Sequence, residues 1–268
     1  MRGDPLRFGP GIDPAAPLAR ANPAAKLAVS LVLSVALLLT VDVVTAGTAL
    51  VLEIAALPWC GLSPGALARR AWVLPAGAVP AAWAAAFLGT DSGATLLVLG
   101  PLTLTEGSAQ AGAAVALRIL AVGLPGVVLL STTDPTALAD SLAQNLHLPH
   151  RFVLAGLAGL SMFGILAEEG QTLRLARRAR GLGGGGPLSR LRSLFGVVFA
   201  LLVVSLRRAT VLATAMEARG FGASPHRTWA RPSPFTRSDT AFCLGGLALA
   251  LLATAAGTAT GSWHMVLS

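Results

Sequence analysis

The sequence predicts an all-α membrane protein that crosses the bilayer several times, and three observations support this fold class. The chain of 268 residues is 54% hydrophobic and only 12% charged, whereas soluble domains carry about 25% charged residues. Its mean hydropathy is +0.71. Long apolar runs alternate with short polar segments. This pattern excludes a disordered chain, a coiled coil and a disulfide-stapled secreted domain, and it argues against a soluble enzyme.

Five apolar runs are expected to form transmembrane helices. They are Leu27 to Val41, Val43 to Leu57, Ala71 to Leu88, Ala111 to Leu130 and Thr240 to Ala259. Several are shorter than the ~20 residues that a crossing needs, and two contain proline, which membrane helices tolerate when neighbours cover the freed backbone groups. The run Ala94 to Thr105 is too short to cross. We expect it to be an external or interfacial loop.

The basic residues indicate how these spans are oriented. The chain has 20 basic and 12 acidic residues, a net charge of +8, and all basic residues but Lys26 are arginine. Apart from Arg118, they fall in the N-terminal segment, in the loop with Arg69 and Arg70, and in the stretch Ser131 to Asp239. The positive-inside rule therefore places the N terminus in the cytoplasm and the C terminus outside. The N-terminal stretch lacks the pattern of a cleaved signal peptide.

Three segments follow from this topology. Residues 1–131 hold the N-terminal tail and spans one to four, residues 132–239 form long cytoplasmic or interfacial helices, and residues 240–268 hold the last span and an external C terminus. Within the middle segment, Arg151 to Glu168 and Leu194 to Leu206 are apolar enough to cross. Two crossings would place six arginines outside, however. We expect these apolar halves to pack against the spans or to lie in the membrane interface, and each helix to end in an arginine-rich tip.

The two tips repeat each other. Ala176 to Gly183 reads ARRARGLG and Ala215 to Gly222 reads AMEARGFG, so Ala-x-x-Ala-Arg-Gly, a large apolar residue and Gly recur 39 residues apart. Glycine just past a helix ends it in a left-handed turn. An arginine there complements the helix dipole and projects its donor fork beyond the helix end. Contact with anionic lipid headgroups is the alternative explanation, but it accounts for the arginines alone.

These paired Ala-Arg-Gly signatures resemble those on two coupling helices of the transmembrane T component of energy-coupling factor (ECF) transporters, the EcfT/CbiQ family. Weaker matches lie along most of the chain. They are Asn22-Pro23-Ala24-Ala25-Lys26, Gly100 to Gly107 before the span with Arg118, Ser131 to Pro135, Leu146-His147-Leu148-Pro149 and Ser205 to Ala209. The first lacks an arginine that the family has, and Asp134 replaces a serine in the third.

The resemblance implies a non-catalytic subunit that joins two cytoplasmic ABC-type ATPases to a small membrane substrate-binding (S) subunit. Such a complex imports a vitamin or a transition-metal ion across the bacterial or archaeal cytoplasmic membrane. The resemblance implies ATPase contacts at Ala179, Arg180 and Gly181 in one tip, and at Ala218, Arg219 and Gly220 in the other. ATP and Mg would be bound by the partner ATPases, with no cofactor in this chain. Glu217, opposite in charge to Arg178, would help each tip select its partner.

Polar residues near the spans carry further expectations. Ser63-Pro64 and Asp134-Pro135 have the composition of helix starts, with Ser63 and Thr133 as caps. Ionisable residues inside spans are functional candidates. Arg118 is a candidate contact with the S subunit. We interpret Glu53 as one half of a structural pair, or as a side chain that reaches toward an interface.

The spacing of lysine, histidine and cysteine residues argues against a nucleotide-binding loop and a metal site. A nucleotide-binding P-loop needs a lysine after a glycine-rich turn, whereas the sole lysine, Lys26, follows Pro23-Ala24-Ala25. The run Gly183 to Gly186 is interpreted as a hinge between the coupling helices. The four histidines are scattered, and Cys60 and Cys243 match no ligand or redox spacing, so we expect no metal site.

Two other functions are alternatives to the role of coupling subunit. A stand-alone secondary transporter is expected to show paired polar residues or interrupted helices in corresponding halves. An integral membrane enzyme is expected to cluster acidic residues or histidines in its spans. This chain instead has isolated acids at Asp42, Glu53, Asp91 and Glu106. In the family that it resembles, substrate specificity belongs to the separate S subunit.

Overall fold

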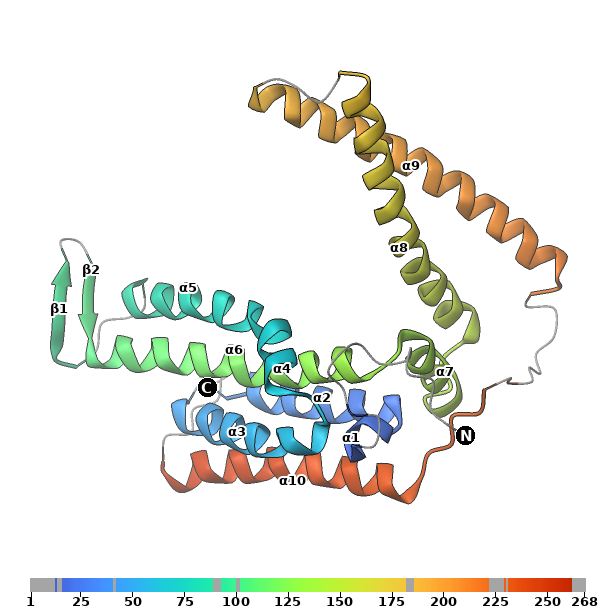
Figure 1. Ribbon diagram of the computed structural model, residues 1–268. Helices are drawn as coiled ribbons and strands as arrows, with labels where there is room; N and C mark the ends of the chain where they lie inside the picture. Colours follow the sequence, from blue (N-terminus) through green and yellow to red (C-terminus); the bar gives the residue numbers. More distant parts are fainter. Residues whose placement is uncertain are drawn as a thin grey trace. The chain divides into compact units, whose positions relative to one another are not determined.

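The computed structural model describes residues 13, 16–40, 42–88, 93–99, 102–181, 186–221, 229 and 231–261 (Figure 1). The chain divides into two compact units, which are considered separately below. The first comprises Met1–Ser141 and Ser233–Ser268, and the second comprises Leu142–Pro232. Most of the described residues are helical, as an all-α membrane protein requires.

The first unit is a helical bundle. Its elements are α1 (Pro17–Arg20), α2 (Pro23–Leu38), α3 (Val43–Ala56), the 3-10 helix η2 (Leu57–Cys60), α4 (Pro64–Ala71), α5 (Val73–Leu88), α6 (Glu106–Thr132) and α10 (Arg237–Ala259). Helix α7 (Pro135–Asn145) crosses the boundary between the units. The second unit contains the two longest helices, α8 (His150–Ala179) and α9 (Pro187–Ala218).

Side-chain caps set several of these helix starts. The carboxylate of Asp42 accepts the backbone N–H of Thr45 at 2.8 Å, and Ser63 Oγ caps α4 as expected. At α7 the expected cap, Thr133, is wrong. The carboxylate of Asp134 accepts both the N–H and the hydroxyl of Thr136, at 3.1 and 2.7 Å. An aspartate bonds the backbone two residues on more readily than a threonine does, which accounts for the difference.

Small residues let the bundle helices approach closely. Helix α6 packs against α2, α3 and α5, and α10 packs against α2 and α3. The central cluster takes one buried residue from each of four helices: Leu37, Ala49, Ala121 and Ala253. At Gly246 of α10 an added Cβ would lie 2.5 Å from Cγ1 of Val29 in α2, so the crossing of these helices requires glycine. Close packing on small residues is typical of membrane helices.

The stretch expected to be a loop between spans three and four is a β-hairpin instead. Strand β1 (Thr95–Leu99) pairs antiparallel with β2 (Leu102–Thr105), with Val98 opposite Thr103 and Leu99 opposite Leu102. β-branched residues favour strands, and Thr105 at the end of β2 also caps α6 through a reciprocal bond with Ser108. The hairpin is a small addition to an otherwise helical fold.

Five stretches of helix among the described residues are long and apolar enough to cross a membrane. They are Val43–Cys60, Glu106–Thr132, His150–Ala179, Leu191–Ala218 and Arg237–Ala259, whereas Pro23–Leu38 and Val73–Phe87 are shorter apolar helices. Three of the five, in α3, α6 and α10, contain predicted spans. Helices α8 and α9 also reach spanning length, so their cytoplasmic or interfacial placement, argued from charge, stays a prediction.

The structure also describes segments that were expected to connect the helices. Arg69 and Arg70 lie in the last turn of α4 and not in a loop. The match at Leu146 to Pro149 lies between two helices, because α7 ends at Asn145 and α8 begins at His150. The predicted hinge at Gly183 to Gly186 lies outside the described residues, apart from Gly186, which directly precedes α9.

Candidate coupling site

The two Ala-Arg-Gly tips have the same backbone structure. Arg180 follows the last residue of α8 with φ −85° and ψ 11°, and Arg219 follows α9 with φ −87° and ψ 9°. The N–H of Arg180 donates to the carbonyl of Ala176 and that of Arg219 to Ala215, each at 3.2 Å. The sequence repeat is therefore a structural repeat of two helix C-termini.

Glycine ends each helix, as the sequence predicts. Gly181 has φ +72° and Gly220 has φ +70°, values in the left-handed region that non-glycine residues avoid. The N–H of Gly181 donates to the carbonyl of Arg178 at 3.0 Å, and that of Gly220 to Glu217 at 2.9 Å. Among the described residues, no atom lies within 4 Å of a Cβ added at Gly181. Glycine is thus required there by backbone conformation and not by crowding.

All six predicted contact residues are exposed at these tips: Ala179, Arg180, Gly181, Ala218, Arg219 and Gly220. Within the described part of the chain, neither the Arg180 nor the Arg219 guanidinium has a hydrogen bond or an ion pair. Both guanidinium groups therefore have their donors available for a partner or for water.

The tips differ in charge although their backbones agree. The last turn before Arg180 contains Arg177 and Arg178, whereas the last turn before Arg219 contains Met216 and Glu217. Arg177 does not point freely outward, because its Nη1 donates to the backbone carbonyl of Ser193 in α9 at 2.9 Å. Arg178 and Glu217 are exposed. The exposed charge difference between the tips is therefore Arg178 against Glu217.

Helices α8 and α9 are joined along their crossing by a few contacts. Near the tip of α8, the Arg177 guanidinium occupies the space in which Gly196 would need a Cβ. Farther along, Arg208 forms an ion pair with Glu169. Gly170 is buried, and a Cβ added there would lie 3.3 Å from Leu201. These contacts hold the two helices as one unit.

Both helices also expose many large apolar side chains. In α8 these include Phe152, Leu160, Phe163 and Leu175, and in α9 they include Phe195, Phe199, Leu202 and Leu206. Soluble domains rarely expose apolar patches of this extent. These surfaces fit contact with lipid or with a membrane partner.

A second polar cluster, not identified from the sequence, lies at the start of α2. We call it the α2 clamp and define it as Asn22, Lys26, Thr132 and Asp239. The Lys26 ammonium donates to the carbonyls of Ala19 at 3.2 Å and Thr132 at 3.0 Å, and to Thr132 Oγ1 at 3.3 Å. Because Thr132 is the last residue of α6, the lysine places its charge at the negative end of that helix dipole.

Asn22 connects the α2 clamp to α10. Its backbone N–H donates to Asp239 Oδ1 at 2.7 Å, and its side-chain amide donates to Ser233 Oγ and to the Pro234 carbonyl at 3.0 and 3.2 Å. The other oxygen of Asp239 accepts from the N–H and hydroxyl of Thr236, which completes a capping box at the start of α10. The Asn-Pro-Ala-Ala-Lys motif thus holds the end of α6 and the start of α10.

Arg118 binds the end of α2 inside the bundle. Its Nε donates to the carbonyl of Leu37 at 2.9 Å and its Nη2 to that of Leu38 at 2.7 Å. These carbonyls are among the last of α2, which have no partner within the helix. The bonds account for an arginine in an apolar helix, and the expected contact of Arg118 with an S subunit stays a prediction.

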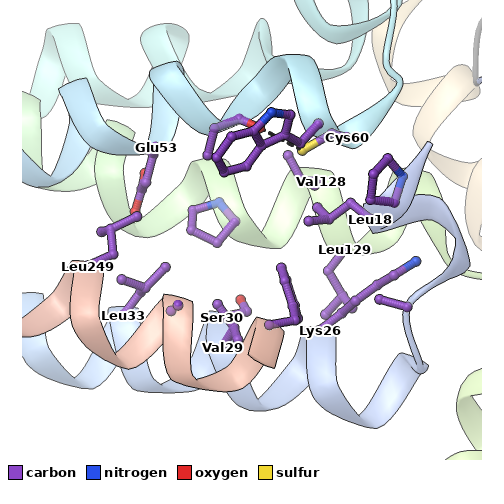
Figure 2. Close-up of a pocket in the computed structure, with 18 of the residues that line it drawn as sticks. Leu18, Lys26, Val29, Ser30, Leu33, Glu53, Cys60, Val128, Leu129 and Leu249 are labelled. Atoms are coloured by element: carbon purple, nitrogen blue, oxygen red, sulfur yellow. Dashed lines mark hydrogen bonds between the residues drawn. The ribbon is translucent and has the colours of Figure 1, made fainter. Parts of the chain in front are cut away.

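Glu53 differs from its interpretation as a paired or interface-reaching residue. It is only 6% exposed, and neither carboxylate oxygen has a hydrogen-bond partner among the described residues. Arg118 and Lys26, the basic side chains bound to the ends of α2 and α6, are both occupied by carbonyls. Glu53 lines a cavity in the bundle (Figure 2). The positions of residues along the sequence do not predict this cavity.

Comparison with known proteins identifies the family. The sequence matches the family described as CbiQ, cobalt transport protein, over residues 14–229. The chain belongs to the CbiQ family. This match includes both tips and the α2 clamp up to Thr132.

Individual relatives agree with this membership in the CbiQ family. The chain is 33% identical over 172 residues to the energy-coupling factor transporter transmembrane protein EcfT of Exiguobacterium sibiricum, covering 61% of this chain and 65% of that protein. It is 32% identical over 158 residues to EcfT of Heliobacterium modesticaldum, covering 56% and 59%. It is 30% identical over 172 residues to EcfT of Bacillus subtilis, covering 61% and 65%. The matches span less than two thirds of the length of these relatives.

The family and the five spanning-length helices together identify a multi-pass membrane protein. The prediction of a T component from the paired signatures is thereby confirmed at the level of the family. Neither comparison concerns Arg180 or Arg219 individually, so their roles stay predictions.

Proposed function

We propose that this protein is the coupling subunit of an ECF-type ABC importer. In this role it transmits the movement of two cytoplasmic ATPases to a membrane S subunit, which releases a vitamin or a transition-metal ion into the cell. The observation that carries the proposal is the pair of structurally equivalent helix ends with exposed arginines. Each offers one guanidinium with its donors available at the end of a helix of about 30 residues.

The chemistry of the tips suits contact with a groove on another protein. Arginine presents a planar fork of donors that binds carboxylates and backbone carbonyls in two-point fashion. The small neighbours Ala179, Gly181, Ala218 and Gly220 allow a groove wall to approach the arginine closely. A lysine in place of either arginine would offer a point charge without that fork, so it is expected to bind less well.

The orientation belongs to the same proposal. We place both tips and the N terminus in the cytoplasm and the C terminus outside, in the cytoplasmic membrane of a bacterium or an archaeon. The distribution of basic residues among the loops supports this orientation. ATP and Mg are then bound and used by the partner ATPases, and this chain acts without a cofactor as a non-catalytic subunit.

Co-purification from the native host tests the proposal directly. We expect the tagged chain in mild detergent to bring down two nucleotide-binding subunits and one small hydrophobic protein. A stable solitary protein would contradict the coupling role and favour a lone transporter or a membrane enzyme.

Variants of the arginines test the site. We expect Arg180→Ala or Arg219→Ala to reduce the recovery of ATPase subunits about tenfold, the equivalent of one lost charge-assisted hydrogen bond, and the double variant to abolish recovery. Arg174→Ala is the matched control, because Arg174 is exposed on α8 but lies before the tip. Equal recovery with the double variant and with the control would refute the assignment of the tips.

Cysteine labelling tests the orientation. In a background with Cys60 and Cys243 replaced by alanine, a cysteine introduced at Gly184 is expected to react with a membrane-impermeant maleimide only after the membrane is opened. Labelling of intact cells would overturn the proposed topology without bearing on the family.

A further inference from the structure

The bundle contains a cavity that the coupling role does not use. It has a volume of about 540 Å³ and lies among α1, α2, η2, α6 and α10, with Glu53 of α3 in its wall (Figure 2). Aliphatic side chains such as Val29, Leu33, Val128 and Leu249 form most of the surface. Cavities of roughly 300–1,000 Å³ with apolar walls and few polar groups are typical of small-molecule sites.

Glu53 is a buried carboxyl in the wall of this cavity that has no hydrogen-bond partner among the described residues. Its side chain enters the cavity on the side of Leu249 and Leu33, and Lys26 lies toward the other side (Figure 2). Glu53 is 6% exposed, and both carboxylate oxygens lack a hydrogen-bond partner among the described residues. A buried carboxyl without a partner is unfavourable, so a ligand that donates to it would be bound with selectivity.

The neighbouring basic residues do not supply that donor. Lys26 lines the same cavity, but its ammonium already donates to Ala19 and Thr132. Asp239, also in the lining, accepts from Asn22 and Thr236. Lys26 and Asp239 are therefore satisfied within the chain, and Glu53 has no such partner among the described residues.

We propose that this cavity binds an amphiphile with an amino head group, whose ammonium donates to the Glu53 carboxylate while its apolar body packs along Val29, Leu33 and Leu249. An ammonium matches a carboxylate with two available oxygens in both charge and donor number, and charge-assisted hydrogen bonds are the strong ones. The aliphatic walls favour a hydrocarbon body over a compact polar ligand. This inference does not depend on the coupling role.

Three probes with the same hydrocarbon chain test the chemistry. Dodecylamine, dodecanol and dodecanoate are added to the purified full chain in nanodiscs of phosphatidylcholine, and thermal unfolding is measured. We expect dodecylamine to raise the unfolding temperature saturably, dodecanol to act about tenfold more weakly, and dodecanoate to have no effect. Equal effects of the amine and the alcohol would overturn the proposal.

Three variants localise the effect. Glu53→Gln keeps the shape and is expected to lower the apparent affinity for dodecylamine about tenfold or more. Gly245→Leu is expected to fill part of the cavity, because Gly245 lines it and, among the described residues, no atom lies within 4 Å of an added Cβ. Gly77→Leu on α5 is the matched control, since Cβ there also meets open space but Gly77 does not line the cavity. Binding lost with Gly245→Leu and kept with Gly77→Leu supports the site. Undiminished stabilisation of the Gly245→Leu variant would show that the amine acts elsewhere and would refute the proposal.

The source of the ligand is identified by mass spectrometry of molecules that co-purify with the chain. Retention of an aminophospholipid by the wild type, and its loss from Gly245→Leu, would assign the amine to a bilayer lipid. Retention of a single-chain amine would assign it to a free amphiphile.

Discussion

The ammonium of Lys26, in the first turn of α2, donates to the backbone carbonyl of Thr132, the last residue of α6, at 3.0 Å and across 106 positions of sequence. The lysine is buried, and it contributes both a charge at a helix C-terminus and hydrogen bonds to carbonyls that have no partner within the helix. The only lysine of the chain therefore has a structural role at the end of a neighbouring helix.

Replacement of Lys26 by methionine is expected to destabilise the bundle. The change keeps most of the apolar stem but leaves the Thr132 and Ala19 carbonyls without their donor, at a cost of about 2 kcal/mol in the free energy of unfolding. Unfolding in nanodiscs by heat or denaturant measures it. Arg20→Met, which removes an exposed cation nearby, is the control and is expected to change stability by less than about 0.5 kcal/mol. Similar losses in both variants would argue against the α2 clamp.

Replacement of Arg118 separates a structural role from a partner contact. Arg118→Leu removes the donors to Leu37 and Leu38, so we expect a loss of about 1–3 kcal/mol in the stability of the isolated chain. Arg118→Lys is expected to restore part of it. A variant that is fully stable alone but fails to recover the small membrane partner would instead assign Arg118 to the interface with the S subunit.

Alanine substitutions at the tip glycines are expected to loosen the helix ends. A non-glycine residue in the left-handed region costs about 1–2 kcal/mol, so Gly181→Ala and Gly220→Ala should speed amide exchange in the last turns of α8 and α9. Gly159→Ala is the matched control, because Gly159 is inside α8 and, in the part of the chain that the structure describes, no atom lies within 4 Å of an added Cβ. There alanine is expected to stabilise the helix by about 1 kcal/mol. The same sign of effect at all three positions would contradict the conformational argument.

A charge exchange tests the ion pair between α8 and α9. Glu169→Arg and Arg208→Glu each place like charges together and are expected to weaken the contact between the helices. The double variant is expected to recover most of the loss. Because these side chains are 29% and 38% exposed, solvent screening limits the coupling energy to less than about 1 kcal/mol. A double-mutant cycle on amide exchange in these helices measures it, and additive effects of the two changes would show that the pair does not contribute.

The elements that the sequence predicted well are those with local causes. The ends of α8 and α9 follow from the chemistry of Gly181 and Gly220, and the starts of α4 and α7 follow from Ser63-Pro64 and Asp134-Pro135. The unpredicted features join residues far apart in the chain. Lys26 and Arg118 bind backbone carbonyls at other helix ends, and a backbone carbonyl has no signature in a sequence. The partnerless state of Glu53 likewise depends on which helices surround it.

The hairpin illustrates a different limit. Thr95 to Thr105 is a short apolar run, and such runs do not distinguish a strand from an interfacial segment by periodicity. Only pairing with the second strand, with Leu99 opposite Leu102, decides the structure. Helices α8 and α9 meet the length and hydropathy of a membrane span for a related reason. Both quantities describe a helix by itself and do not include its surroundings.

The position of the α2 clamp has a consequence for how members of this family can be recombined. Helix α6 ends at Thr132 and the chain returns to the bundle at Ser233, and both points are bound at the start of α2, through Lys26 and Asn22. The segment between them therefore begins and ends at neighbouring, fixed sites. A homologous segment with its own tips is expected to be exchangeable as one cassette, provided that the recipient keeps these two anchoring side chains.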